Sequence, residues 1–112
     1  MNIKRIISGK ILKRNLCNMV KYEVIYSNQF KKSLKKMLKQ GKDLSKLDLV
    51  IEKLAIKEQL EIKNRDHALY DDKKYKGCRD CHIEPDWLLI YKYLDNELIL
   101  LLVNTGSHSD VF

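Results

Sequence analysis

The sequence predicts a single α+β domain in which two helices pack on a mostly antiparallel sheet, in the order β-α-α-β-β-β. Two stretches have the apolar spacing of amphipathic helices, and four others have the alternation or the composition of strands. The length of 112 residues suits one domain, and 45% hydrophobic residues with one proline and four glycines indicate a folded chain. Helices and strands grouped in this way are typical of the α+β class.

The first predicted strand covers residues 21–26, because KYEVIY alternates and is rich in β-forming residues. A helix follows, and either Ser27 or Asn28 can cap its N-terminus. Gly41 is a suitable end for this helix, because glycine readily adopts the left-handed conformation found there. The apolar stripe of the helix consists of Phe30, Leu34, Met37 and Leu38. Its lysines occupy the other faces.

The second predicted helix begins after Asp43 or Ser45, either of which can cap it. Its inward-facing positions are Leu44, Leu47, Val50 or Ile51, and Leu54. Residues 58–74 are polar, charged and without a regular period, so we expect a long loop there.

Three further strands complete the predicted sheet. One covers approximately residues 75–83 and ends at the turn Glu84-Pro85-Asp86. The segments WLLIYKYL (87–94) and ELILLLVN (97–104) form the other two, joined at Asp95-Asn96 by a two-residue hairpin turn. Such short connections favour antiparallel pairing of the strands that they join.

The positive charge is unevenly distributed along the chain. The net charge is +7, but residues 1–19 carry five basic residues and no acid, so residues 20–112 carry only +2. Overall basicity is therefore a weak argument for nucleic-acid binding. Seven lysines fall within sixteen residues, and such a run is either a solvated helix face or a phosphate-facing surface. These lysines are Lys31, Lys32, Lys35, Lys36, Lys39, Lys42 and Lys46.

Residues 1–19 form a basic N-terminal extension ahead of the predicted domain, which covers residues 20–112. The apolar residues of the extension are spaced close to helical periodicity, so it could lie on a membrane surface or act as a targeting peptide. It lacks the continuous apolar core and the small-residue cleavage site of a secretory signal. We interpret Met19 as the true start and residues 1–18 as an upstream in-frame extension.

Hydropathy and cysteine content argue against two protein classes. The longest apolar run, Leu98–Val103, is too short to span a bilayer, which predicts a soluble protein without stable membrane association. Three cysteines are too few, and odd in number, for a secreted disulfide scaffold. A reducing cytoplasm is therefore the expected location.

The stretch GCRDCH contains Cys78, Cys81 and His82 in the C-x-x-C-H pattern that attaches a c-type haem. Such haem proteins are exported and usually need a second axial ligand, yet the last methionine is Met37, upstream of the motif. Zinc needs two further ligands at a fixed spacing, and a redox motif is expected to open a helix. On a strand, Cys81 and His82 face opposite sides. We interpret the cysteines as ordinary strand residues, with a small metal- or haem-binding protein as the remote alternative.

All three histidines lie in the second half of the chain, in predicted loops or strand ends. They are His67, His82 and His108. Asp86 follows His82 across the turn at Pro85. Imidazole titrates near neutral pH, so a pair of histidines can supply a base and an acid. If they converge beside a carboxylate, they can support metal-free RNA cleavage, which must deprotonate a 2′-hydroxyl, stabilise a phosphorane and protonate the 5′-oxygen.

The segments KNRDHAL, YKGCRDCHIEPDWLLIYKY and TGSHSDVF resemble the signatures of YafQ-type toxins in the RelE/ParE superfamily. The resemblance covers Val20–Phe112 and implies a RelE-like fold. It also implies a type II toxin that enters the ribosomal A site and cuts mRNA without a metal ion or cofactor, leaving a 2′,3′-cyclic phosphate. The expected partners are the ribosome, mRNA and a cognate antitoxin encoded next to the toxin. The expected toxin–antitoxin complex is a heterotetramer or larger.

The resemblance implies site residues by position. Five residues match family active-site positions, namely the catalytic residues His67, His82, Asp86 and His108 and the supporting residue Asp80. Trp87 and Phe112 match positions linked to substrate contact or to the frame of the site, and Asn104 is a further supporting residue. The cations expected to contact RNA or the ribosome are Lys32, Lys35, Lys36, Arg65, Lys76 and Arg79. We expect His108 and Asp86 to be the acid and base. His82 would orient the substrate or stabilise the transition state.

One position departs from the family pattern. Asn104 stands where the family commonly has arginine, which would stabilise the phosphorane electrostatically. Asparagine supplies no charge, so either activity is reduced or another cation compensates, the candidates being Arg65, Lys76 and Arg79. Two alternative functions therefore stay open, a weakened nuclease and a non-nucleolytic ParE-like toxin that acts by binding. Trp87 is either a core residue or a base-stacking platform.

Overall fold

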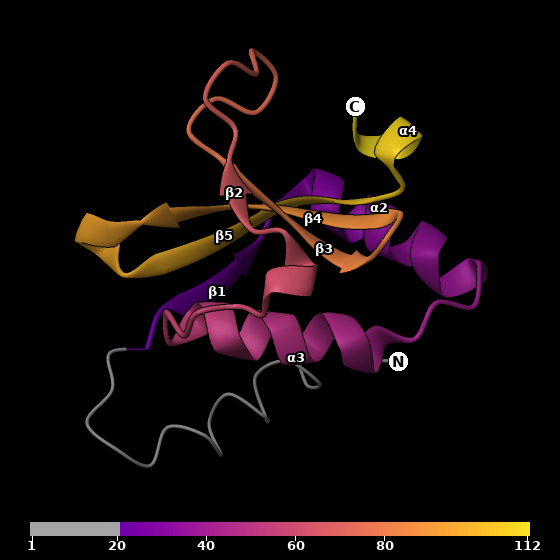
Figure 1. Ribbon diagram of the computed structural model, residues 1–112, viewed down its shortest axis with the longest axis horizontal. Coiled ribbons are helices and arrows are strands. Elements are labelled where there is room, and N and C mark those ends of the chain that lie inside the picture. The colour runs from indigo at the N-terminus through magenta and orange to yellow at the C-terminus, as the bar shows by residue number, and fades with distance from the viewer. Residues whose placement is uncertain (1–20) are drawn as a thin grey trace.

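A computed structural model describes residues 21–112, and the predicted extension over residues 1–19 lies outside the described residues. Five strands form one sheet in the order β1-β5-β4-β3-β2, with β1 parallel to β5 and the other pairs antiparallel (Figure 1). The elements are β1 (Glu23–Tyr26), α2 (Asn28–Lys39), α3 (Leu44–Ala55), η1 (Ile62–Asn64), β2 (His67–Ala68), β3 (Arg79–Glu84), β4 (Trp87–Leu94), η2 (Asp95–Glu97), β5 (Ile99–Gly106) and α4 (His108–Val111). The predicted α+β class with a mostly antiparallel sheet is confirmed.

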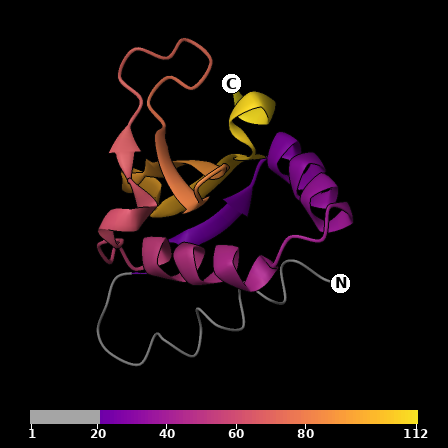
Figure 2. The same cartoon turned by 45° about the vertical axis from the view of Figure 1, so that its right-hand side comes forward.

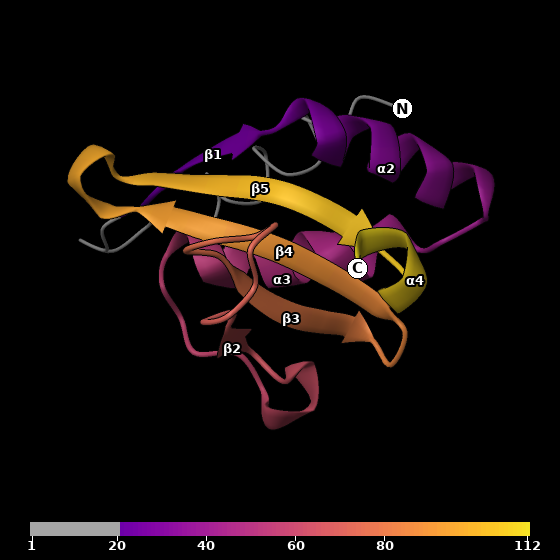
Figure 3. The ribbon, with the colours of Figure 1, turned by 90° about the horizontal axis from the view of Figure 1, so that it is seen from above.

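The two faces of the sheet are covered differently. The apolar stripes of α2 and α3 pack on one face, here called the helix-covered face, and form the main core with residues of β3, β4 and β5. The other face, here called the open face, carries α4 and the loop between β2 and β3 (Figure 2). Figure 3 shows α4 lying across the ends of β4 and β5. A smaller cluster on the open face consists of Tyr75, Cys78, Leu88, Ile90 and Val111.

Side-chain caps begin both long helices. The Ser27 hydroxyl accepts the Phe30 N–H at 3.0 Å, so Ser27 is the residue that caps α2. The Asp43 carboxylate accepts the Ser45 N–H at 3.0 Å and caps α3. Gly41 follows α2 with a φ of +78°, which agrees with its predicted place beyond the helix end. The sequence thus predicted both helices, and the structure identifies the cap of each.

Two strand boundaries differ from the prediction. β3 begins at Arg79 rather than near residue 75, because the Asp72 carboxylate accepts the N–H groups of Lys74 and Tyr75 at 2.8 and 3.0 Å and turns the chain. β4 and β5 are joined by the 3-10 helix η2 and by Leu98 in the left-handed conformation, instead of the predicted two-residue turn. The longer connection starts β5 later, and β5 then extends beyond the predicted end at residue 104.

Besides η2, three short elements were not predicted. η1 and β2 lie within residues 58–74, and α4 follows the last strand. The Ser107 hydroxyl accepts the Asp110 N–H at 3.2 Å, and the Asp110 carboxylate accepts the Ser107 N–H at 3.2 Å, which forms a capping box. These elements are too short to show a hydropathy period. Among the described residues, no helix combines the length and apolar character needed to cross a membrane.

Candidate active site

β3 and β2 bring a carboxylate and two histidines together on the open face. Alternation along β3 puts Asp80 and His82 on this face and Cys81 on the helix-covered face, as predicted. β2 pairs with β3 so that His67 lies directly opposite Asp80. The His67 Nε2 is 3.7 Å from an Asp80 carboxylate oxygen, which is an ion-pair distance when the ring is protonated. A two-residue strand therefore delivers a loop histidine to the site.

Backbone carbonyls orient the rings of His67 and His82. The His67 Nδ1 lies 2.7 Å from the Arg65 carbonyl oxygen. The His82 Nδ1 lies 3.2 Å from the Pro85 carbonyl oxygen. Because a carbonyl accepts and does not donate, each Nδ1 carries a proton. In the neutral ring, the Nε2 of each histidine is then unprotonated and can accept a proton.

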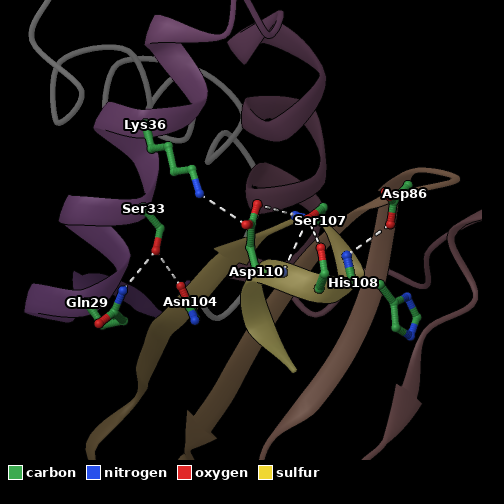
Figure 4. Close-up of polar contacts among 9 residues, drawn as sticks. Gln29, Ser33, Lys36, Asp86, Asn104, Ser107, His108 and Asp110 are labelled. Atoms are coloured by element: carbon green, nitrogen blue, oxygen red, sulfur yellow. Dashed lines mark hydrogen bonds and ion pairs between the residues drawn. The ribbon is translucent and has the colours of Figure 1, made fainter.

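The one-turn helix α4 places His108 beside His82. The centroids of the two imidazole rings are 6.4 Å apart. The carboxylate of Asp86, just before β4, accepts the backbone N–H of His108 at 2.9 Å (Figure 4). The centroids of the Phe112 and His108 rings are 5.5 Å apart. The turn between β3 and β4 is thus attached to the helix that carries His108.

Asp80 is the buried charge of this cluster. Its exposed fraction is 2%, and its Oδ1 has no hydrogen-bond partner within residues 21–112. Burial raises the pKa of Asp80, whereas His67, His82 and His108 oppose the shift, because imidazolium favours a nearby carboxylate. All three histidines therefore lie within electrostatic reach of one carboxylate.

Trp87 and Phe112 differ in accessibility. Trp87 is fully buried in the main core, and its indole N–H donates to the Thr105 hydroxyl at 2.9 Å. Its role is that of a core residue, because neither face of the ring is accessible for stacking on a base. Phe112 is 48% exposed and contacts His108, so it belongs to the edge of the site.

Asn104 is a buried connector. Its exposed fraction is 3%, and its amide oxygen accepts the Ser33 hydroxyl at 2.6 Å and the Thr105 N–H at 2.9 Å. Its amide nitrogen donates to the Tyr75 hydroxyl at 2.9 Å. Because the amide is buried and engaged at both ends, Asn104 is not presented to a substrate as a hydrogen-bond donor.

The predicted cations lie in separate places. Lys32, Lys35 and Lys36 are exposed on α2, and the Lys36 Nζ is 3.0 Å from the Asp110 carboxylate on α4. Arg65 and His82 line one groove of about 600 Å³ between α3 and η1. The lysines of α2 and Arg65 therefore flank the histidine cluster on two sides.

The remaining two predicted cations have less direct access to the cluster. Lys76 is exposed in the loop between β2 and β3. Arg79 alternates away from Asp80, and its guanidinium donates to the Asp66 carboxylate at 3.3 Å and to the Tyr91 hydroxyl at 3.2 Å. The structure does not bring Arg79 to the histidines.

The two cysteines do not form a shared site. Cys81 packs in the main core and Cys78 in the cluster on the open face. Burial raises the pKa of both thiols, so the thiolate forms that bind metals are disfavoured. Within residues 21–112, no three His, Cys, Asp or Glu side chains are grouped so as to hold a metal ion. The C-x-x-C-H pattern is therefore not a ligand set in this fold.

Two residues near the site were not predicted from the sequence. Tyr75 is buried, and its hydroxyl donates to the Val111 carbonyl on α4 at 2.6 Å. No local pattern marks a single tyrosine as the support of a distant helix. Ser107 is the N-cap of α4, and here the spacing of Ser107 and Asp110 is a recognisable capping-box signal.

Comparison with known proteins gives consistent matches over the described part of the chain. The family model for "Bacterial toxin of type II toxin-antitoxin system, YafQ" matches residues 22–112. The mRNA interferase toxin YafQ of Escherichia coli is 38% identical over 96 residues, covering 84% of this chain and 99% of the relative. The E. coli DinJ-YafQ toxin–antitoxin complex aligns with a TM-score of 0.73 and 36% identity, over 83% of this chain and 99% of that chain. A metal-bound toxin from Helicobacter pylori aligns with a TM-score of 0.75 and 40% identity, over 81% and 99%.

Proposed function

Since the chain belongs to the YafQ family of bacterial toxins of type II toxin–antitoxin systems, we propose that it is an mRNA interferase that cleaves mRNA on the ribosome. The observation that carries this proposal is the grouping of His67, His82 and His108 around the buried carboxylate of Asp80. A ParE-like toxin that acts by binding has no use for such a cluster. The cluster therefore favours the nuclease over the non-nucleolytic alternative.

The proposed reaction uses the RNA's own 2′-hydroxyl as nucleophile. A base removes the 2′ proton, the oxygen attacks the adjacent phosphorus, and the bond to the 5′-oxygen breaks as an acid protonates that oxygen. The products are a 2′,3′-cyclic phosphate and a 5′-hydroxyl. We assign the two proton transfers to His108 and Asp86, which are joined by a backbone hydrogen bond, and substrate orientation to His82. No metal ion is required in this scheme.

The charge that develops on the phosphorane needs a partner other than Asn104. His82 and His67 are suitable in their protonated form, because an imidazolium ring carries positive charge and both rings lie in the cluster around Asp80. Arg65 is the best placed of the predicted compensating cations, because it lines the same groove as His82. A cluster of this kind supplies positive charge without the family arginine.

We further propose the partners and the location. The related E. coli toxin is found in a DinJ-YafQ toxin–antitoxin complex, which supports a cognate antitoxin for this chain, in an assembly that is a heterotetramer or larger. The ribosome and mRNA would be engaged in the cytoplasm. The exposed lysines of α2, Lys32, Lys35 and Lys36, are suited to phosphate contacts that position the toxin.

The test is cleavage of mRNA on programmed ribosomes by the full chain, with mapping of the RNA ends. Wild-type toxin should leave a 2′,3′-cyclic phosphate, and His108→Ala should lower the rate by about 10²–10⁴-fold while ribosome binding is retained. Ser109→Ala, on the same helix turn, is the matched control. Charge reversal at Lys32, Lys35 and Lys36 should weaken binding without changing the RNA ends.

Metal dependence is a separate arm of the experiment, because the Helicobacter relative is described as metal-bound. Cleavage should survive EDTA once the ribosome's own magnesium requirement is controlled for. A toxin that binds ribosomes and arrests growth without cutting RNA would contradict the proposal. A rate for His108→Ala equal to that of Ser109→Ala would contradict the assigned chemistry.

A further inference from the structure

A chain of hydrogen bonds links α2 to the C-terminal end of α4. The Ser33 hydroxyl on α2 donates to the Asn104 amide oxygen at 2.6 Å (Figure 4). The Asn104 amide nitrogen donates to the Tyr75 hydroxyl at 2.9 Å, and that hydroxyl donates to the Val111 carbonyl at 2.6 Å. Asn104 and Tyr75 are 3% and 4% exposed, so the middle of the chain is shielded from water.

The direction of these hydrogen bonds is fixed by the backbone. The Thr105 N–H lies 2.9 Å from the Asn104 Oδ1, so this atom must be the acceptor and the amide nitrogen must face Tyr75. Because the Tyr75 hydroxyl oxygen accepts from Asn104, its proton is available for the Val111 carbonyl. Lys74 Nζ is a second donor to the same carbonyl, at 3.3 Å. Asn104 therefore determines where the Tyr75 proton points.

α4 depends on such outside support for its position. A helix of four residues has a single turn, and isolated helices of this length are unstable in water. Asp86 anchors the start of α4 through the His108 N–H at 2.9 Å, and Tyr75 anchors its end through Val111. His108 is held directly by the first anchor and is joined to the second through the same helical turn.

Ring contacts connect Tyr75 to His108 by a second route. The Tyr75 and Phe112 rings meet edge to face with centroids 5.7 Å apart. The Phe112 ring lies 5.5 Å from His108, and the His108 ring lies 6.4 Å from His82. A shift of Tyr75 would therefore reach His108 through both the backbone of α4 and the Phe112 ring.

We propose that Tyr75 is a positioning residue for RNA cleavage, because its hydroxyl, directed by Asn104, holds α4 so that His108 reaches the scissile phosphate. This proposal rests on the proposed nuclease function. A misplacement of about 1 Å in a catalytic group can cost about 10²-fold in rate. It also gives Asn104 a role unlike that of an arginine at the same position, namely to orient a hydroxyl and not to supply charge.

The test compares Tyr75→Phe with Tyr93→Phe in the full chain. The Tyr93 hydroxyl also donates to a backbone carbonyl, that of Leu54 at 2.5 Å, but Tyr93 packs against the main core on the helix-covered face. Each variant loses one hydrogen bond from a tyrosine hydroxyl to a backbone carbonyl, so the two should melt at similar temperatures. Tyr75→Phe should lower kcat on programmed ribosomes about tenfold or more with KM within about twofold, whereas Tyr93→Phe should keep the wild-type kcat.

Amide hydrogen exchange gives a readout independent of cleavage. Tyr75→Phe should speed exchange of the Val111 and Phe112 N–H groups, which bond to carbonyls within the α4 turn, and leave exchange in β4 and β5 unchanged. Equal kcat values for the two variants, or equal exchange in α4, would overturn the positioning role. If wild-type toxin does not cleave RNA, the nuclease assignment fails, and the exchange result still decides whether Tyr75 anchors α4.

A second variant covers the case in which Tyr75→Phe does not fold. Asn104→Asp keeps the shape of the side chain but replaces the donor nitrogen with an acceptor oxygen, so the Tyr75 proton turns from Val111 to the carboxylate. The same fall in kcat and the same faster exchange in α4 are expected. A wild-type kcat in folded Asn104→Asp protein would refute the proposal.

Discussion

Replacing Asp86 with asparagine and, separately, with alanine should distinguish proton transfer from the anchoring of α4. The Asp86 Oδ1 accepts the His108 N–H at 2.9 Å. Asparagine keeps an acceptor oxygen at this point but cannot exchange a proton at catalytic pH. Alanine removes both the acceptor and the titratable group. Both variants therefore lack the titratable carboxyl group, but only the asparagine variant keeps the hydrogen bond to the His108 N–H.

The expected magnitudes follow from the exposure of this contact. A hydrogen bond at an exposed site contributes modestly, so Asp86→Ala should lower the free energy of unfolding by about 1 kcal/mol, and Asp86→Asn by less. If Asp86 transfers a proton, both variants should lose about 10²–10⁴-fold in the rate of cleavage. If Asp86 serves as an anchor without transferring a proton, Asp86→Asn should stay close to the wild type and Asp86→Ala should not.

The assay is single-turnover cleavage of an mRNA on programmed ribosomes, paired with urea unfolding of each variant. Ribosome binding should be equal in all three proteins, which separates chemistry from docking. An Asp86→Asn variant that cleaves within about tenfold of the wild type would remove Asp86 from the acid–base pair. His108 would then need a different proton-transfer partner, and His82 would be a candidate, because the centroids of the two rings are 6.4 Å apart.

Two further predictions concern stability and pH. Replacing Cys78 and Cys81 with alanine should preserve growth arrest and lower the free energy of unfolding by about 1 kcal/mol. A folded but inactive double variant would contradict this prediction, as would stoichiometric zinc or haem bound to the wild-type protein. Because burial raises the pKa of Asp80, the folded state gains stability in acid and loses it as the pH rises through that raised pKa. Asp80→Asn should therefore raise the free energy of unfolding at neutral pH, and this gain should disappear below about pH 3.9. The rate of RNA cleavage should fall in the same variant. Urea unfolding at several pH values measures the sign of the stability change.

The long elements were predictable because their signals are local. The stripe of α2 and the cap of α3 each arise from residues within one helix, and the inner strands have strong apolar runs. β2 and α4 have two and four residues, which is too few for a period to appear. The position of β2 is set by its pairing with β3, and the position of α4 by the hydrogen bonds with Asp86 and Tyr75, which are distant in the sequence.

The sequence predicted which residues form the candidate site better than it predicted how they are arranged. The resemblance supplied His67, His82 and His108, but the contact of His67 with Asp80 depends on the register of β2 against β3. The burial of Asn104 likewise depends on packing between α2, β5 and the loop of Tyr75, which no local pattern encodes. The identities of the site residues could thus be predicted from the sequence, but their contacts could not. Trp87 could be a core residue or a base-stacking platform, and only its burial in the structure decides between these two roles.

The separation of the sheet into a helix-covered face and an open face has a genetic consequence. In a selection for survivors of toxin expression, loss-of-function mutations should fall into two phenotypes. Substitutions in the main core, such as those at Phe30 or Leu89, should reduce the amount of folded toxin and be rescued at low temperature. Substitutions at His82 or His108, on the open face, should leave a stable, abundant protein that does not arrest growth at any temperature.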